Sequence, residues 1–300
     1  MGRKPGLRRD GAVGEALAAF GRDILAEAQS PLEKTPINDA VAVHDFRKAM
    51  KRWRALLWLL QPSVGNEARE SRIAARDLAR ELAPARDGQS ALDALADLEK
   101  IETGLSARSF QTIRARLEAL KAAAETTTLT DALRARLNTA LADAGEALLR
   151  WPIDSIGFDE IASALCNGYR RGRRAMPAHW SAADVEELHT LRQRVVVHRY
   201  QMELVEPLWP RLGKMWVSEA QRLRERLGTC QDLAVLARLT EPRGPLAHWR
   251  GRLKPAIAAR HALHVNAAAR LAGRIFAESP RGFRRRLEAL WDSGASAREA

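Results

Sequence analysis

One segment of this chain occurs twice, and the two copies lie 145 residues apart. The segment VHDFRKAMKRWRALLWLLQP, residues 43–62, aligns without a gap with LHTLRQRVVVHRYQMELVEP, residues 188–207. The same register continues further along, because Asp87 follows the first copy at the spacing with which Asp232 follows the second. This repeat predicts two homologous halves that divide near Trp151 and Pro152 and are related by a pseudo-two-fold axis.

Both copies have the apolar period of an amphipathic helix. Apolar residues recur at steps of three and four, and this pattern, in segments rich in Ala, Leu, Arg and Glu, covers most of the chain. No stretch shows the sustained alternation of β-branched residues that is typical of strands. We therefore predict an all-α fold with prolines between its helices. These prolines are Pro31, Pro36, Pro62, Pro84, Pro152, Pro177, Pro207, Pro210, Pro242, Pro245 and Pro280.

The first copy, drawn as a helix, has a basic face and an apolar face. The basic face holds His44, Arg47, Lys48, Lys51 and Arg54. The apolar face, which must pack against neighbouring helices, holds Phe46, Met50, Trp53, Leu57 and Leu60. Like charges at this spacing repel one another by roughly 0.2–0.5 kcal/mol per pair. A face that accepts this repulsion indicates an external anion, although a solvated basic face gives the same pattern.

The second copy keeps part of this basic face. It retains the histidine and two arginines as His189, Arg192 and Arg199, whereas Gln193 and Val196 replace the two lysines. Its apolar face holds Leu191, Val195, His198, Met202 and Val205. The retained register favours an anion site over a chance basic surface, and the lost lysines predict a weaker second half-site.

A further basic cluster, YRRGRR, precedes the second copy. Arg170, Arg173 and Arg174 are candidate phosphate ligands because a planar guanidinium can donate two parallel hydrogen bonds. Gly172 would let a ligand approach the backbone closely. A solvated positive helix is the alternative. For the third run, Arg284–Arg286, a charged surface near the chain end is the favoured interpretation.

Composition narrows the class of protein. The 300 residues carry a formal net charge of +12, which indicates an anionic partner. With 46% hydrophobic residues the chain can bury a core, so extended disorder is excluded. The longest apolar run, Ala55 to Leu60, is far shorter than the roughly 20 residues of a membrane span. Two isolated cysteines, Cys166 and Cys230, and the lack of a secretory pattern favour a cytoplasmic protein without disulfides.

These segments together resemble one known family, the CHAD domain, or conserved histidine α-helical domain. The resemblance rests on VHDFRKAMKRWR, on YRRGRRA, on LHTLRQRV with HRYQMELVEPLWP, and on the paired ARDGQSALDAL and CQDLAVLARL. It covers about residues 13–292, with halves at about 13–150 and 151–292, and it leaves residues 1–12 and 293–300 as expected flexible tails. It implies two four-helix bundles related by pseudo-two-fold symmetry, with a basic central cavity.

The resemblance also implies a ligand. CHAD domains bind inorganic polyphosphate in the basic cavity, so we expect a non-catalytic binding module without a cofactor, located in the cytoplasm or on polyphosphate granules. Val196 stands where the family usually has lysine, and His198 where an aromatic residue is frequent. The family positions and the two basic segments together give the expected polyphosphate-binding residues, which are His44, Arg47, Lys48, Lys51, Arg54, Arg170, Arg173, Arg174, His189, Arg192 and Arg199.

Residue patterns for catalysis or metal binding are weak. No two glutamates are separated by a single residue, and neither a Walker loop nor an H-E-x-x-H motif occurs. His261 and His264 could share a metal, but without a carboxylate or cysteine cluster a structural or surface role is favoured. We expect the two cysteines to be buried fillers, and tryptophans such as Trp58 to pack in the core. We therefore expect no catalytic and no metal-binding residues.

Two other functions stay open at this level. The net charge alone would suit a nucleic-acid-binding helical protein, although no helix-turn-helix, RRM or zinc module can be identified. A hydrolase acting on phosphate esters or polyphosphate is less favoured, because no carboxylate cluster accompanies the basic segments. We expect no membrane partner.

Overall fold

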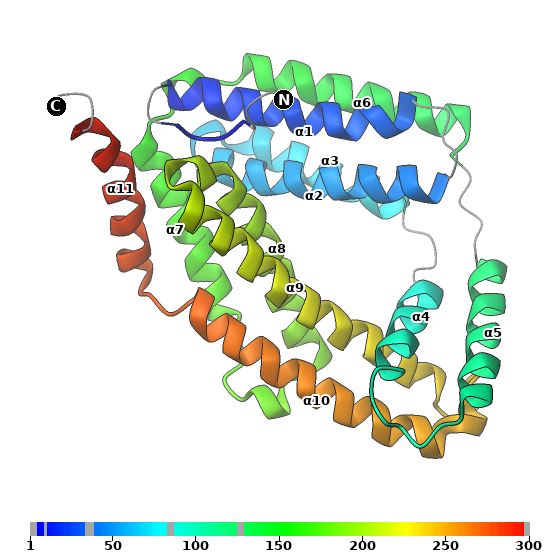
Figure 1. The fold of residues 1–300 in the computed structure, drawn as a ribbon. Coiled ribbons are helices and arrows are strands. Elements are labelled where there is room, and N and C mark those ends of the chain that lie inside the picture. Colours follow the sequence, from blue (N-terminus) through cyan, green and yellow to red (C-terminus); the bar gives the residue numbers. More distant parts are fainter. Residues whose placement is uncertain (1–4, 9–10, 34–38, 83–86, 125–128, 297–300) are drawn as a thin grey trace.

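The computed structural model describes residues 5–8, 11–33, 39–82, 87–124 and 129–296, and within these ranges the fold is all-α (Figure 1). The prediction of an all-α fold is confirmed. The helices are α1 (Val13–Glu33), α2 (Asp39–Val64), α3 (Asn66–Glu81), α4 (Asp87–Leu98), α5 (Ala107–Ala124), α6 (Asp131–Arg150), α7 (Phe158–Arg174), α8 (Val185–Val205), α9 (Pro210–Leu239), α10 (Arg250–Ile275) and α11 (Pro280–Ser296). Short 3-10 helices lie at Ile153–Ser155, Trp180–Ala182, Glu206–Leu208 and Ala247–Trp249.

Local sequence signals set several helix ends. Asp184 caps α8 by accepting a hydrogen bond from the Glu187 backbone N–H, and the Glu187 carboxylate accepts one from the Asp184 N–H. In the first half, α3 ends at Glu81, shortly before Pro84, which lies outside the described residues. The equivalent residue of the second half is Thr229, and α9 continues through it. Since proline disfavours a helix interior, this difference accounts for two helices in one half and one long helix in the other.

Other prolines lie at or near helix ends, though not always between helices. Pro210 and Pro280 are the first residues of α9 and α11, where a proline lacks only a hydrogen bond that the helix would not make. Pro31 and Pro62 lie inside the last turns of α1 and α2, so the prediction that they separate helices is wrong. Pro36 lies outside the described residues.

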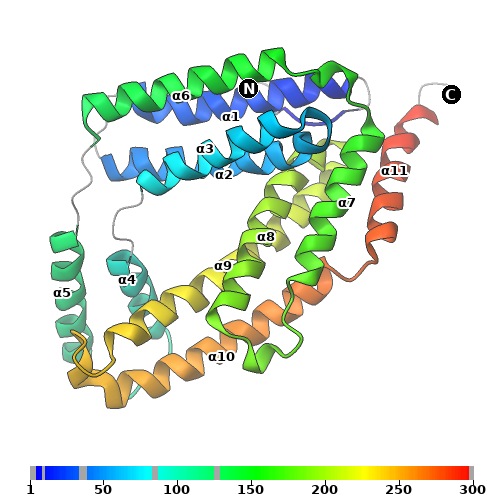
Figure 2. The same cartoon turned by 180° about the vertical axis from the view of Figure 1, so that it is seen from behind.

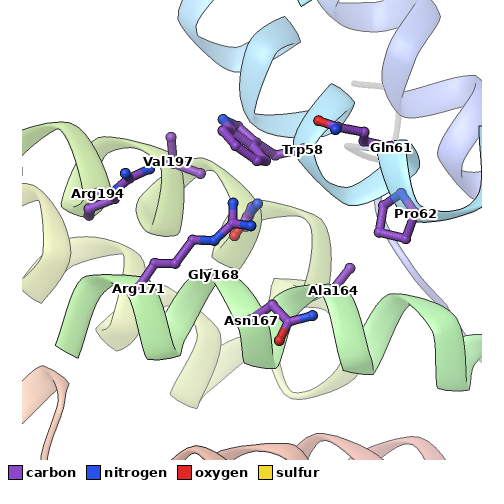
Figure 3. Close-up of a pocket in the computed structure, with 10 residues that line it drawn as sticks. Trp58, Gln61, Pro62, Ala164, Asn167, Gly168, Arg171, Arg194 and Val197 are labelled. Atoms are coloured by element: carbon purple, nitrogen blue, oxygen red, sulfur yellow. The ribbon is translucent and has the colours of Figure 1, made fainter. Parts of the chain in front are cut away.

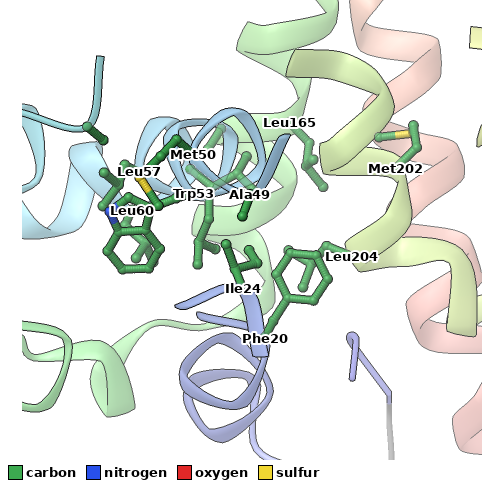
Figure 4. Packing of buried hydrophobic residues seen from close by; sticks show 14 of the residues in the cluster. Phe20, Ile24, Ala49, Met50, Trp53, Leu57, Leu60, Leu165, Met202 and Leu204 are labelled. Atoms are coloured by element: carbon green, nitrogen blue, oxygen red, sulfur yellow. The ribbon is translucent and has the colours of Figure 1, made fainter. Parts of the chain in front are cut away.

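The first copy of the repeat forms the centre of a bundle of α1, α2, α3 and α6 (Figures 1 and 2). Every residue of the predicted apolar face of α2 is buried, with an exposed fraction of 2% or less. Phe20 and Ile24 of α1 lie beside Met50 and Trp53 of α2 in this core (Figure 4). The amphipathic pattern therefore placed the core face of α2 correctly.

The second copy is packed in the same way by α7, α9 and α11. Every residue of the predicted apolar face of α8 is buried, including His198 at 3% exposed. Leu165 of α7 and Met202 and Leu204 of α8 belong to the same hydrophobic cluster as the core of α2 (Figure 4). A single core therefore runs from the first bundle into the second, where α2 contacts both α7 and α8.

A separate core joins the two halves at the far end of the molecule. The hairpin of α4 and α5 packs on the end of α9 and the start of α10, with Leu95, Ile113, Leu236 and Leu253 in one cluster. The boundary between the two hydrophobic cores therefore does not coincide with the boundary between the two halves of the sequence. Figures 1 and 2 show the α2–α3 pair and the α9–α10 pair diverging from the α7–α8 junction, with α4 and α5 beside the far end of α9 and α10.

Helix starts also follow the repeat. Val13 begins α1 and Phe158 begins α7, again 145 residues later. The corresponding starts of α2 and α8 are Asp39 and Val185, within one residue of the same interval. This correspondence supports two homologous halves, whereas the pseudo-two-fold axis stays a prediction.

Parts of the two predicted flexible tails pack against the fold or belong to a helix. Leu7 is fully buried, and its backbone N–H donates a 2.8 Å hydrogen bond to the Leu204 carbonyl, so the segment around it is not a free tail. At the other end, α11 continues to Ser296, into the predicted C-terminal tail. Residues 1–4, 9–10 and 297–300 of the predicted tails lie outside the described residues. Among the helices described, none combines the length and the apolar character needed to cross a membrane.

Candidate functional site

Arginines from four helices form one electropositive region where the two bundles meet. Arg54 of α2 interacts electrostatically with Arg72, Arg76 and Arg80 of α3. Arg72 interacts in turn with arginines of α7 and α8. We call this group the arginine cluster, and its members are Arg54, Arg69, Arg72, Arg76, Arg80, Arg171 and Arg194.

Burial and mutual repulsion both act on this cluster. Burial lowers the pKa of Arg54, and the positive charges of Arg72 and its neighbours on α3 lower it further. Burial likewise lowers the pKa of Arg72 and of Arg171, with added repulsion from Arg194 in both cases. A lowered guanidinium pKa means that the folded chain holds positive charge at a free-energy cost. An anion bound here would offset that cost.

Trp58 of α2 lies at the centre of the cluster. The guanidinium carbon of Arg72 lies 4.0 Å from the centroid of its indole ring, and that of Arg171 lies 4.5 Å away. Both distances are within the range of cation–π attraction. The prediction that Trp58 packs in the core is therefore wrong, since its half-buried ring holds two arginines of the cluster in place.

A small pocket opens beside this ring. It has a volume of about 160 Å³ and lies between α2, α7 and α8 (Figure 3). We call it the Trp58 pocket. Its polar lining and the ring itself come from Trp58, Gln61, Asn167, Arg171, Arg194 and Gln201.

The predicted basic face of α2 is only partly in this cluster. Arg54 belongs to it, and Arg47 turns towards α3, where its guanidinium donates a 2.8 Å hydrogen bond to the Ala79 carbonyl. His44 and Lys48 are exposed and Lys51 is half-buried on the same helix. The face therefore runs from the cluster towards the start of α2.

The second copy uses its predicted residues for contacts within the fold. Arg192 donates a 2.9 Å hydrogen bond to Gln231 of α9, and the ring of His189 is hydrogen-bonded to the same Gln231 and to Gln193. The two contacts with Gln231 hold α8 against α9.

Arg199 pairs with an acid instead. Its guanidinium lies 3.0 Å from the Glu203 carboxylate, which also pairs with the buried Arg52 of α2 at 3.3 Å. Arg199 and Arg192, seven residues apart, share a face of α8 that lies roughly opposite Arg194 and the pocket. Both arginines have partners within the fold, and the weaker second half-site stays a prediction.

One residue of the YRRGRR segment, Arg171, lines the Trp58 pocket, although it was not among the predicted ligands. Arg170 donates a 2.5 Å hydrogen bond to Asn167, and Arg173 donates one to the Glu278 carbonyl. Arg174 is exposed. Arg171, between them, lines the Trp58 pocket.

Gly172 has a packing role in this segment. A Cβ atom there would lie 2.7 Å from the ring of Phe276. The glycine therefore allows Phe276 to pack against α7. The expected approach of a ligand to this backbone position has no support in the structure.

Sequence reasoning missed the arginines of α3, although a signal was present. Arg69, Arg72, Arg76 and Arg80 follow one another at steps of three and four, which places them on one helix face. The repeat does not point to them, because the second half has no matching run of arginines. Arg194 gave no such signal, since only the packing of α8 against α2 brings it to the cluster.

The remaining chemical groups have structural roles. His264 is buried, and its Nε2 lies 2.8 Å from the Asp97 carboxylate. Cys166 and Cys230 are free and buried, as expected, and burial raises the pKa of the Cys230 thiol to about 12. Within the described ranges, no group of three or more His, Cys, Asp or Glu side chains could hold a metal ion.

Comparisons with known proteins address the fold as a whole. The sequence model of one family, the CHAD domain, matches residues 15–241. PptA from Streptomyces chartreusis has a similar structure, with a TM-score of 0.60 and 19% identity over 89% of this chain and 100% of that one. The crystal structure of the CHAD domain from the plant Ricinus communis gives a TM-score of 0.56 and 19% identity over 96% of this chain and 95% of that one. A comparison with curated proteins finds no match.

Proposed function

Because this chain belongs to the CHAD domain family, we propose that it is a non-catalytic binding protein for inorganic polyphosphate. The arginine cluster around Trp58 is the proposed contact surface, and the basic face of α2 extends it towards His44. The proposed location is the cytoplasm, including polyphosphate granules.

One observation carries this proposal. Arg54, Arg72 and Arg171 have lowered pKa values because burial and neighbouring arginines crowd positive charge at the junction of the bundles. The carboxylate of Asp77 acts on Arg54 at this site, but it is exposed and hydrogen-bonded to Arg76 at 2.8 Å. The crowded guanidinium groups thus favour an external polyanion as their partner.

Polyphosphate fits the chemistry of such a surface. It carries about one negative charge per phosphate, and each guanidinium can donate two parallel hydrogen bonds to phosphate oxygens. Binding would also release condensed counterions, and this release makes the free energy of binding more favourable at low salt. The arginines of α3, at three- and four-residue steps, place successive cations about 5 Å apart along the helix axis.

Binding of long-chain polyphosphate by charge-neutralised variants tests the proposal. The triple variant Arg54→Gln, Arg72→Gln and Arg171→Gln should lose at least a hundredfold in affinity at near-physiological salt, since each charge-assisted contact contributes roughly 1.5–3 kcal/mol. The matched control is Arg150→Gln, Arg222→Gln and Arg238→Gln, three exposed arginines outside the cluster with the same change in net charge. Equal affinities of the two triple variants would contradict the site.

A second set of variants separates the cluster from the predicted basic faces. Charge reversal of Arg47, Arg54 and Arg192 tests the repeated positions directly. We expect most of the loss to come from Arg54, because Arg192 is hydrogen-bonded to Gln231 within the fold. If the Arg192→Glu variant alone weakened binding as much as Arg54→Glu, the second half-site would be a full contributor.

The Trp58 ring favours one alternative, a nucleic-acid-binding surface. An aromatic ring flanked by arginines can stack a base, as single-strand-binding proteins do. Competition between polyphosphate and single-stranded RNA or DNA at equal phosphate concentration decides between the two. The proposal predicts that nucleic acid displaces little polyphosphate, whereas efficient displacement would favour the alternative.

The non-catalytic part of the proposal has its own test. Incubation of the protein with polyphosphate and Mg²⁺ or Mn²⁺ should release no phosphate above the rate of a protein-free control. Phosphate release that is lost in an Arg72→Gln variant would contradict it and indicate a hydrolase.

A further inference from the structure

One position of the repeat carries a different kind of residue in each half. Trp58 of α2 aligns with Glu203 of α8, in the same register that pairs Arg54 with Arg199. In the second half, Glu203 lies four residues after Arg199 and pairs with it at 3.0 Å. In the first half, the residue four positions after Arg54 is the uncharged Trp58. Two equivalent arginines therefore meet different neighbours.

Each of these two residues gathers an arginine from either half of the chain. Glu203 pairs with Arg52 of the first half at 3.3 Å, in addition to the arginine of its own helix. The guanidinium carbons of Arg72 on α3 and Arg171 on α7 lie 4.0 and 4.5 Å from the ring centroid of Trp58. A carboxylate neutralises the arginines that it holds. An aromatic ring attracts a guanidinium through its quadrupole and leaves the charge unchanged.

The two arginines at Trp58 repel their neighbours. The charges that act most strongly on Arg72 all belong to arginines, among them Arg171, and the charge that acts on Arg171 belongs to Arg194. Nε of Arg72 is buried without a hydrogen-bond partner among the described residues. Repulsion between like charges would move these side chains apart if nothing held them. The ring of Trp58 opposes this repulsion without cancelling the charge.

Resting on the proposed function, we propose that Trp58 is a positioning residue of the polyanion site, which holds Arg72 and Arg171 together where the two halves meet and leaves both charges for the ligand. At the aligned position of the second half, Glu203 holds its arginines by neutralising them. The residue type at this position thus determines which copy of the repeat offers its arginines to a phosphate chain.

The first test separates the ring from the space that it fills. Trp58→Phe keeps an aromatic ring, and Trp58→Leu keeps an apolar side chain without one. Trp58→Leu should bind long-chain polyphosphate about tenfold more weakly than the wild type, as expected for the loss of two cation–π contacts. Trp58→Phe should stay within about threefold of the wild type, because a phenyl ring still attracts a guanidinium. Equal affinities of the two variants would show a space-filling role and overturn the inference.

The second test places the second-half residue in the first half. Trp58→Glu puts a carboxylate four residues after Arg54, which repeats the pairing of Arg199 with Glu203. Its uncharged match is Trp58→Gln. The Glu variant should bind polyphosphate at least about tenfold more weakly than the Gln variant, since its carboxylate takes a charge-assisted hydrogen bond from the ligand.

Two further readouts accompany this comparison. The logarithm of the binding constant should fall less steeply with the logarithm of salt concentration in Trp58→Glu, by about 0.7 per neutralised arginine. The unfolding free energy of Trp58→Glu should nevertheless exceed that of Trp58→Gln, because the carboxylate relieves repulsion among the arginines. A Glu variant that binds as tightly as the Gln variant would contradict the inference, and so would one that loses affinity and stability together.

Trp209 supplies the matched controls. It is 50% exposed, precedes α9 and lies outside the arginine cluster. Trp209→Leu, Trp209→Gln and Trp209→Glu make the same changes in ring and net charge and should bind like the wild type. Control variants that lose as much affinity as the Trp58 variants would overturn the inference.

The failure of the inference and the failure of the proposed function are distinguishable. If all the Trp58 variants bind polyphosphate like the wild type, the inference is overturned and the polyphosphate site stays in place. If the wild-type protein does not bind polyphosphate, the proposed function is overturned together with the inference.

Discussion

His198 is a buried ionisable residue on the core face of α8. Its ring lies 5.8, 5.5 and 6.0 Å from the rings of Tyr169, Phe276 and Phe283, and its Nδ1 has no hydrogen-bond partner. Burial, with repulsion from Arg286, lowers the pKa of His198 to about 4. It occupies the position of Trp53 in the first copy, so the sequence could predict its place in the core but not the pKa that this place imposes.

The unfolding free energy should therefore fall as the pH is lowered. An unfolded histidine takes up a proton below its ordinary pKa of 6.5, whereas the folded chain resists protonation of His198 until about pH 4. Stability is thus present above pH 6.5 and is lost by about 3 kcal/mol between pH 6.5 and pH 4. Chemical denaturation across this range measures the loss.

His198→Phe isolates this contribution from that of other titrating groups. The variant keeps an aromatic ring of similar size among the same neighbours and removes the titration. The difference in unfolding free energy between variant and wild type should grow as the pH falls from 6.5 to 4. A constant difference would show that His198 titrates normally in the fold.

At the scale of elements, α4 is attached to the other half of the chain by a buried polar cluster. Asp97 accepts hydrogen bonds from Arg260 at 2.7 and 2.8 Å and pairs with His264 at 2.8 Å. Burial alone would raise the pKa of Asp97, but the hydrogen bonds from Arg260 and His264 outweigh it and lower the pKa to about 2. Arg226 of α9 lies 3.2 Å from Nδ1 of His264 and can only donate, so His264 is neutral and Nε2 donates to Asp97.

Asp97→Asn should loosen α4 and α5 from α9 and α10. Removing one partner of a buried ion pair costs roughly 3 kcal/mol or more, because the other charge stays buried. Hydrogen exchange should accelerate in α4 and at the end of α9, with a lower unfolding midpoint. The control is Asp93→Asn, an exposed acid of the same helix that accepts a 2.8 Å hydrogen bond from Gln89. Equal exchange rates in the two variants would contradict a role for Asp97 in this attachment.

The sequence predicted some elements well for a physical reason. The apolar faces of α2 and α8 were correct because burial imposes the helical period directly on the residues. The docking of α4 and α5 on α9 and α10 was not predictable, because it depends on a pairing between halves that leaves no period in either segment. Likewise, the sequence analysis predicted only that Pro84 lies between helices, and the continuous α9, with Thr229 at the equivalent position, emerged only in the fold.

At the scale of the whole molecule, positive charge gathers where the two bundles meet. The arginine cluster draws on α2 and α3 from the first half and on α7 and α8 from the second. The predicted site and the observed cluster share Arg54, while Arg192 and Arg199 serve the packing of the second bundle. The proposed ligand class rests on charge and on the family, both legible in the sequence, whereas the arginine cluster became visible only from the packing of four helices.

Salt dependence should report how many of these arginines a polyanion meets. For a single-stranded polyanion, the logarithm of the binding constant falls with the logarithm of salt concentration by about 0.7 per contact. The triple variant of Arg54, Arg72 and Arg171 should therefore show a slope about 2 units shallower than the wild type. Titrations at several salt concentrations measure it, and an unchanged slope would place these arginines outside the contact surface.

A crystal structure of the protein with a short linear polyphosphate tests the central claim most directly. We expect phosphate density to begin in the pocket beside Trp58 and to continue over Arg72 towards Arg76 and Arg80. Density bound only elsewhere, for example along Arg284–Arg286, with the arginine cluster empty, would contradict the account.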